Sequence, residues 1–195
     1  MKRLPLSVKC ILVLLPVIVF LVSYNLGMEE QRFKPHIYTM RAAKVLVAKI
    51  KGDPEITMDT AGITLYSAAR KLKLSPSYIS GRHLDWKQRD TTPMKDWVVD
   101  YSRMVPETAI GLADIKDSTT VSIFYDRRKE TQVAEILHLG RYENIPESLV
   151  KLRQFVERQG YRLSGYYEEV YLVFEHIEPN PNNYETLLRY QVSKL

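Results

Sequence analysis

The sequence contains a single cysteine, Cys10, and this residue lies inside an N-terminal apolar segment. The rest of the chain lacks cysteine, so it can form neither an internal disulfide nor a thiolate zinc site. His138 has beside it neither a nucleophile nor the spacing of a metal-ligand set. We therefore expect no metal and no other cofactor.

The chain also lacks a strong excess of one charge. Its formal net charge is +5, and Lys2, Arg3 and Lys9 contribute three of the 28 basic residues. The remainder carries 25 basic and 23 acidic residues without a basic stripe. This balance argues against a nucleic-acid partner. Residues 126–130 (DRRKE) form one short charged cluster, which we expect to be a solvated hairpin tip.

The N-terminal segment contains no acidic residue. Residues 4–26 form a nearly continuous apolar run, about long enough for the roughly 20 residues that cross a bilayer. A cleavable signal peptide is the alternative, but residues 21–23 (LVS) match its small-x-small site poorly. We favour a transmembrane signal-anchor over residues 1–27, with cleavage left open. Basic residues precede the run, whereas Glu29 and Glu30 follow it, which predicts a domain outside the cytoplasm.

The rest of the chain divides into a polar linker over residues 28–43 and one domain over residues 44–195. Alternating apolar residues predict strands, and apolar stripes at helical spacing predict two helices. Residues 77–95 are polar and irregular, and we expect a strand or a long hairpin there. The predicted strands cover residues 44–50, 95–105, 119–125, 131–139, 165–174 and 185–192, and the predicted helices run from Asp59 or Thr60 to Leu74 and from Asn144 to Gly160.

Two parts of the domain follow the same order of elements. A strand, a helix and a further strand with aromatic residues occur over residues 44–105 and again over 131–174. We therefore predict an α+β fold in which two strand-helix-strand-strand units share an antiparallel sheet. A concave cleft between repeated units is a common place for a ligand.

Residues 165–174 (GYYEEVYLVF) combine two adjacent acids with a strand-like pattern. Side chains of a strand alternate between its two faces. Glu169 then lies between tyrosines, and this arrangement suits a cationic or polarised organic molecule. Glu168 falls on the apolar face, where we expect a strand-edge surface residue. The predicted core face carries Val170, Leu172 and Phe174, and the opposite face carries Tyr167, Glu169, Tyr171 and Val173.

Two segments together carry a resemblance to a known family. VAEILHLGRYENIPESLVKLRQFVERQGY contains a His-x-Gly-x-Tyr turn at His138, Gly140 and Tyr142, and the following strand contains a Glu-x-Tyr pair at Glu169 and Tyr171. This pattern resembles the GyrI-like small-molecule-binding family. The family includes effector-binding domains of multidrug-sensing transcription regulators of the AraC and MerR types.

The resemblance is clear over residues 119–192 and looser over residues 44–105. It implies a tandem of two units with an aromatic-lined cleft. In the multidrug sensors the glutamate of the Glu-x-Tyr pair lies in that cleft and binds cationic aromatic ligands. In other members, which are hydrolases, the matching glutamate takes part in catalysis. The corresponding residue here is Glu169. Unlike the regulators, this sequence shows no helix-turn-helix segment, so we do not expect it to act as a transcription factor by itself.

The candidate ligand-binding residues all have a structural alternative. Glu169 could instead pair with a surface Arg or Lys. The aromatic candidates could simply pack in the sheet, in the turn before the second helix, or in the core. The candidates are Glu169, Tyr167, Tyr171, Tyr142, Trp97 and Tyr101.

Three functions remain open. The first is a membrane-tethered binding protein for small hydrophobic or cationic organic ligands. The second is a hydrolase of a small molecule with Glu169 as general acid or base, which would be the one catalytic residue we can name. The third is a membrane-bound adaptor for an unknown protein partner.

Overall fold

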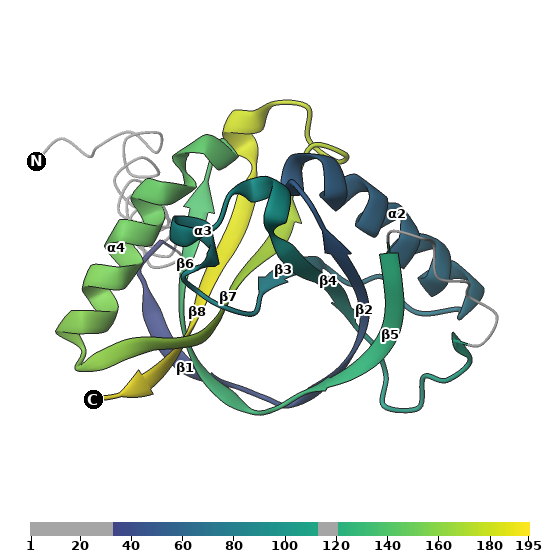
Figure 1. Ribbon diagram of the computed structural model, residues 1–195, viewed down its shortest axis with the longest axis horizontal. Coiled ribbons are helices and arrows are strands. Elements are labelled where there is room, and N and C mark those ends of the chain that lie inside the picture. Colours follow the sequence, from purple (N-terminus) through teal and green to yellow (C-terminus); the bar gives the residue numbers. More distant parts are fainter. Residues whose placement is uncertain (1–32, 113–120) are drawn as a thin grey trace, which may run out of the picture. The chain divides into compact units, whose positions relative to one another are not determined.

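The computed structural model describes residues 33–112 and 121–195, which fold into strands, two long helices and several short helical turns (Figure 1). The long helices are α2 (Pro54–Lys71) and α4 (Ile145–Arg158), and α3 (Gln88–Thr91) is short. The 3-10 turns are η1 (Met94–Asp96), η3 (Tyr142–Asn144) and η4 (Pro181–Asn183). The strands are β1 (His36–Met40), β2 (Ala43–Lys51), β3 (Ile79–His83), β4 (Val98–Met104), β5 (Val121–Arg128), β6 (Thr131–Leu139), β7 (Tyr161–Val173) and β8 (Glu185–Lys194).

The eight strands form one sheet in the order β1-β6-β8-β7-β3-β4-β2-β5. All neighbouring strands are antiparallel. The predicted α+β class and antiparallel sheet are therefore confirmed.

Two units of equal element order build the centre of this sheet. The first is β2-α2-β3-β4, and the second is β6-α4-β7-β8. They meet where β3 pairs with β7, and there Gly81 lies opposite Glu169. Figure 1 shows α2 beside one half of the curved sheet and α4 beside the other. The junction of the two units therefore lies between the helices.

The sequence explains α4 well. Pro146 occupies the first turn, where its missing N–H costs no hydrogen bond. Leu149, Leu152 and Val156 form a buried stripe against β6 and β7. Each such side chain contributes about 1.5–3 kcal/mol through burial. Gly160 then adopts a positive φ of 74°, a conformation that favours glycine after a helix.

Helix α2 begins earlier than predicted, at Pro54 instead of Asp59 or Thr60. The carbonyl of Asp53 accepts the backbone N–H groups of Ile56 and Thr57 at 3.0 and 2.9 Å. The Thr57 hydroxyl donates to the same carbonyl at 2.9 Å. These contacts organise a first turn that apolar periodicity alone does not reveal.

Residues 36–40 are wrongly predicted as part of the linker, since they form edge strand β1. This strand pairs with β6, and the Tyr38 hydroxyl donates to Glu135 at 3.0 Å. Residues 77–95 contain only a five-residue strand, β3, followed by α3 and the start of η1. Of the two alternatives predicted for this segment, the strand is confirmed and the long hairpin is wrong.

The predicted anchor over residues 1–27 lies outside the residues that the structure describes. Within 33–112 and 121–195, no helix is both long enough and apolar enough to cross a membrane.

Both faces of β7 are buried, and the helices cover the face of Tyr167 and Tyr171 instead of the face predicted to be the core. Tyr171 packs with the apolar residues of α2, and Tyr167 packs with those of α4. Glu168 is wrongly predicted as a surface residue, since its exposed fraction is 0%. It lies on the sheet face away from the helices and contacts Arg128 and other arginines. Arg128 therefore does not belong to a merely solvated hairpin tip.

Candidate ligand-binding site

A cavity of about 590 Å³ opens where the two units meet. Its walls come from the beginnings of α2 and α4, from β3 and β7, and from the segments that precede β4 and β8. Aromatic side chains dominate the lining, with two carboxylates at the entrance and one deeper in the sheet. The residues that line it include Met58, His83, Met94, Trp97, Tyr142, Glu143, Glu169, Tyr171, Glu175 and Tyr184.

Glu169 is the carboxylate at the base of this cavity, and its exposed fraction is 7%. The Tyr167 hydroxyl donates to its Oε1 at 2.7 Å, and the Tyr171 hydroxyl donates to its Oε2 at 3.2 Å. Burial, and then the nearby Glu169 carboxylate, raise the pKa of Tyr171 well above its usual value. Tyr171 therefore stays neutral and keeps its proton for this hydrogen bond.

Tyr142 forms part of the cavity wall on the side of α4. A buried histidine positions it: His138 lies within hydrogen-bonding distance of Ser148 (2.9 Å) and of the Arg141 carbonyl (3.0 Å). Gly140 has a φ of 102°, which this turn requires and side chains disfavour. The His-x-Gly-x-Tyr motif thus shapes the turn that carries Tyr142.

The Tyr142 ring contacts Tyr171 edge to face, with 6.2 Å between centroids, and Tyr184 at 5.3 Å. Its hydroxyl donates to Glu175 at 3.1 Å. Burial, followed by the charge of Glu175, raises the pKa of Tyr142 above its usual value. The wall therefore presents neutral aromatic faces and edges.

Trp97 lines the cavity on the side of the first unit. Its indole N–H donates to the Thr92 carbonyl at 2.7 Å, and its ring packs edge to face with His83 at 5.0 Å between centroids. Tyr167 stacks on His83 at 5.5 Å and approaches Tyr190 at 5.1 Å. With an exposed fraction of only 1%, Tyr167 supports Glu169 from within the core.

The structure brings four of the six candidate residues to the cavity wall: Glu169, Tyr171, Tyr142 and Trp97. Tyr167 reaches the site through its hydroxyl. Tyr101 lies within the apolar core beneath α2, and its exposed fraction is 0%.

Sequence reasoning missed His83, Met58, Tyr184 and Glu175. His83 falls within residues 77–95, where the sequence shows no clear periodicity, and Tyr184 falls between two predicted strands, at residues 165–174 and 185–192. Met58 precedes the predicted start of the first helix. An earlier helix start at Pro54 would have placed Met58 at the cavity, because residues four apart share a helix face.

One group of metal-ligand side chains occurs among the described residues, formed by Asp59, Glu175 and His176. All three are exposed. His176 lies 3.1 Å from a carboxylate oxygen of Asp59, while Glu175 accepts the hydroxyl of Tyr142. Contacts within the protein thus engage all three side chains at the rim of the cleft.

The fold is similar to several solved structures. A hydrolase from Listeria innocua matches with a TM-score of 0.67 at 18% identity, covering 83% of this chain and 93% of that one. The C-terminal domain of EcmrR matches with a TM-score of 0.67 at 16% identity, covering 84% and 99%. At these identities the likeness shows the fold alone. No protein-family model matches the chain, and neither does any of the curated proteins searched.

Proposed function

We propose that the domain is a GyrI-like, effector-binding type of domain that holds small hydrophobic or cationic organic molecules against Glu169. The observation that carries this proposal is a buried carboxylate at the base of an aromatic-lined cavity. A volume of about 590 Å³ lies within the range of pockets for small organic ligands, roughly 300–1,000 Å³. The shared fold with the EcmrR C-terminal domain is consistent with it.

The chemistry of the wall favours a cation over a neutral ligand. The hydroxyls of Tyr167 and Tyr171 both donate to Glu169, so these two wall residues present donors and not cations to its carboxylate. A ligand cation near the carboxylate gains a charge interaction that little water screens. Each tyrosine or tryptophan face adds about 0.5–2 kcal/mol of cation–π attraction. Tyr142 and Trp97 line the cavity on its two sides and are placed to supply such faces.

The direct test compares a cation with a neutral molecule of the same shape. The full chain is titrated with phenyltrimethylammonium and with tert-butylbenzene, followed by tryptophan fluorescence. We expect Glu169→Gln to weaken binding of the cation at least about tenfold and to change binding of the neutral molecule little. Glu130→Gln, at the exposed β5-β6 turn, is the matched control. Equal affinity for the cation in wild type and Glu169→Gln contradicts the proposal.

A hydrolase is the second candidate, because a carboxylate within 3.2 Å of a neutral tyrosine hydroxyl can act as general acid or base. Glu169 is the residue we assign to proton transfer, assisted by Tyr171. A panel of p-nitrophenyl esters offers a simple readout. Turnover that disappears in Glu169→Gln supports this candidate, and binding without turnover supports the first.

We also propose that residues 1–27 tether the domain to a membrane, with the domain outside the cytoplasm. The length of the apolar run and the charges on its two sides support this. The full chain should sediment with membranes, and a variant that lacks residues 1–28 should not. In intact cells, added protease should cleave the domain. A full chain that stays in the supernatant contradicts the tether, and a protected domain contradicts the orientation.

A further inference from the structure

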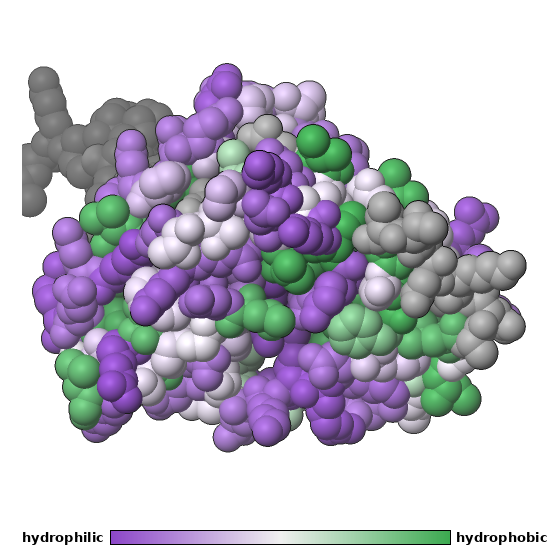
Figure 2. Space-filling model, viewed as in Figure 1, coloured by the Kyte–Doolittle hydropathy of each residue, from purple (hydrophilic) through white to green (hydrophobic). Residues whose placement is uncertain are grey.

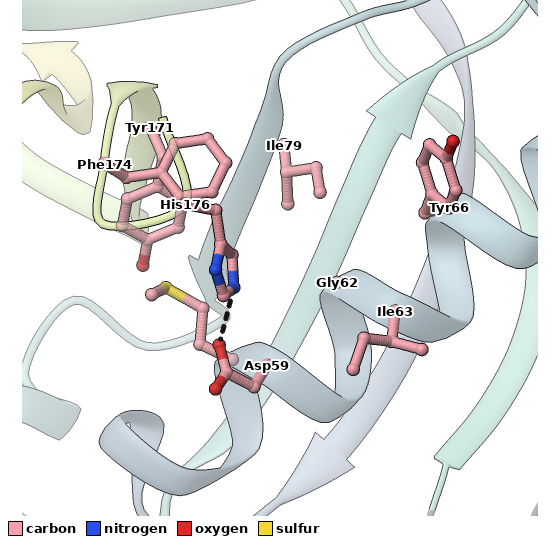
Figure 3. A pocket seen from close by; sticks show the side chains of 9 residues that line it. Asp59, Gly62, Ile63, Tyr66, Ile79, Tyr171, Phe174 and His176 are labelled. Carbon is pink, nitrogen blue, oxygen red and sulfur yellow. Dashed lines mark hydrogen bonds and ion pairs between the residues drawn. The ribbon is translucent and has the colours of Figure 1, made fainter. Parts of the chain in front are cut away.

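A second cavity, of about 300 Å³, adjoins the candidate ligand-binding site (Figure 3). It lies between α2 and the end of β7. Gly62 and Ile63 of α2 form one side, and Ile79 and Phe174 lie across from them. A register shift in the pairing of β7 with β8 follows Tyr171, and beyond it Phe174 lines this cavity together with Tyr171.

Two residues belong to both cavities: Met58 and Tyr171. Tyr171 is also the residue whose hydroxyl donates to Glu169. A molecule held at Glu169 therefore has the apolar cavity on the other side of the same tyrosine. Met58 has an unbranched, flexible side chain, which can move aside for a ligand more easily than a branched one.

The second cavity has an apolar floor and a polar rim. Ile79 and Phe174 are partly buried against the core, whereas Asp59 and His176, which lie 3.1 Å apart, are both exposed (Figure 3). Ile63 is a large apolar side chain with an exposed fraction of 66%. Figure 2 shows hydrophobic side chains that interrupt the polar surface on the side of α2. This cavity can thus hold hydrocarbon, but it offers little to a second charged group.

We propose that the ligand is an amphiphilic cation whose charged head lies at Glu169 and whose alkyl chain passes Met58 into the second cavity. This inference rests on the proposed function, because it extends the same site. A molecule that fills both cavities gains charge pairing in the first and burial of methylene groups in the second. Each buried methylene raises affinity about three- to fourfold until the cavity is full.

Gly62 gives a way to close the second cavity without touching the first. A Cβ at this position meets only the Cδ1 of Ile79, at 4.0 Å, so a Cβ has room there. Gly62→Leu also replaces a poor helix former by a good one. Thr60→Leu adds the same side chain at an exposed position of α2 and serves as the matched control.

The test titrates the full chain with alkyltrimethylammonium ions from ethyl to octyl, with phenyltrimethylammonium as a ligand for the first cavity alone. In wild type and Thr60→Leu, affinity should rise about three- to fourfold per methylene and then level off. In Gly62→Leu the rise should disappear while the affinity for phenyltrimethylammonium stays the same. Ile63→Asn, at the exposed rim, should reduce the rise and provides a second variant.

Two results overturn the inference: an affinity in wild type that does not depend on chain length, or the same rise in Gly62→Leu and Ile63→Asn as in wild type. Both results leave the proposed function intact if Glu169→Gln still weakens the binding of phenyltrimethylammonium. Loss of that dependence contradicts the proposed function instead, so the two failures are distinguishable.

Discussion

Arg128, on edge strand β5, donates a hydrogen bond of 2.5 Å to the carboxylate of Glu168 on β7, although β3, β4 and β2 lie between these strands in the sheet. Arg82 and Arg189 contact the same carboxylate at 3.4 and 3.5 Å, and the Ser80 hydroxyl donates to it at 3.1 Å. The curvature of the sheet makes these contacts possible. Glu168 therefore connects an edge strand to the centre of the sheet, on the face opposite the candidate site.

Removing the charge of Glu168 should destabilise the fold strongly. In Glu168→Gln, three guanidinium groups remain in a largely buried setting without their shared partner. Breaking a buried ion pair from one side costs about 3–5 kcal/mol. We expect the free energy of unfolding, measured by urea denaturation, to fall by about 3 kcal/mol or more. Glu130→Gln is the control and should stay within about 0.5 kcal/mol of wild type. A Glu168→Gln protein as stable as the control contradicts this role.

The same carboxylate should make stability depend on pH. Burial acts to raise the pKa of Glu168, but the attraction of Arg128, Arg82 and Arg189 and the bond from Ser80 outweigh it and lower the pKa below 4.5. A depressed pKa means that the unfolded chain takes up a proton more readily than the folded one. The contribution of Glu168 is therefore present above pH 4.5 and is lost as pH falls through the folded-state pKa.

Urea midpoints of wild type and Glu168→Gln between about pH 3 and pH 7 isolate this contribution, because all other carboxyl groups are common to both proteins. The difference in stability should be largest near neutral pH and should shrink in acid. A difference that is constant across this range means that Glu168 does not titrate as proposed.

At Gly81, the addition of a single methyl group should lower both the stability of the fold and the affinity for a cation. It lies opposite Glu169 on the neighbouring strand, and a Cβ there comes within 3.2 Å of both the Tyr101 ring and the Tyr171 hydroxyl. Overpacking of this kind typically costs about 1–3 kcal/mol. We expect Gly81→Ala to lower stability by that amount and to weaken cation binding, because Tyr171 must move relative to Glu169.

Gly62→Ala is the matched substitution, and we expect it to raise the stability of the fold instead of lowering it. Its Cβ has space, and alanine stabilises a helix by about 1 kcal/mol relative to glycine. Urea denaturation of both variants checks the pair. If Gly81→Ala is as stable as Gly62→Ala, the junction of the two units is looser than the structure indicates.

Helices and strands that are marked by a pattern within their own segment could be predicted from the sequence. Strand β6 has the predicted bounds, and α4 follows from its proline, its apolar stripe and Gly160. Alternation also separated Glu169 from Glu168, because neighbouring residues of a strand face opposite sides whatever surrounds them.

The residues that surround each face of β7 could not be predicted from the sequence. Whether Glu168 is solvated depends on arginines from β3, β5 and β8, and only the curvature of the whole sheet brings them together. A register shift after Tyr171 interrupts strict alternation, so Phe174 reaches the same cavity as Tyr171. Both effects depend on pairing between distant segments, which a single sequence does not record.

Tyr142 provides the last prediction, because its ring and its hydroxyl have separable roles. The ring lies on the cavity wall against Tyr171, while the hydroxyl donates to the exposed Glu175 at the rim. If the ring contributes cation–π attraction of about 0.5–2 kcal/mol, Tyr142→Ala should weaken phenyltrimethylammonium binding by roughly two- to thirtyfold. Tyr142→Phe keeps the aromatic face and should bind within about twofold of wild type. Tyr78→Ala removes an exposed tyrosine outside the cavity and is the control. Fluorescence titration of the three variants separates the roles: equal losses in Tyr142→Ala and Tyr142→Phe assign the effect to the hydroxyl and its bond to Glu175, and no loss in either excludes Tyr142 from the ligand wall.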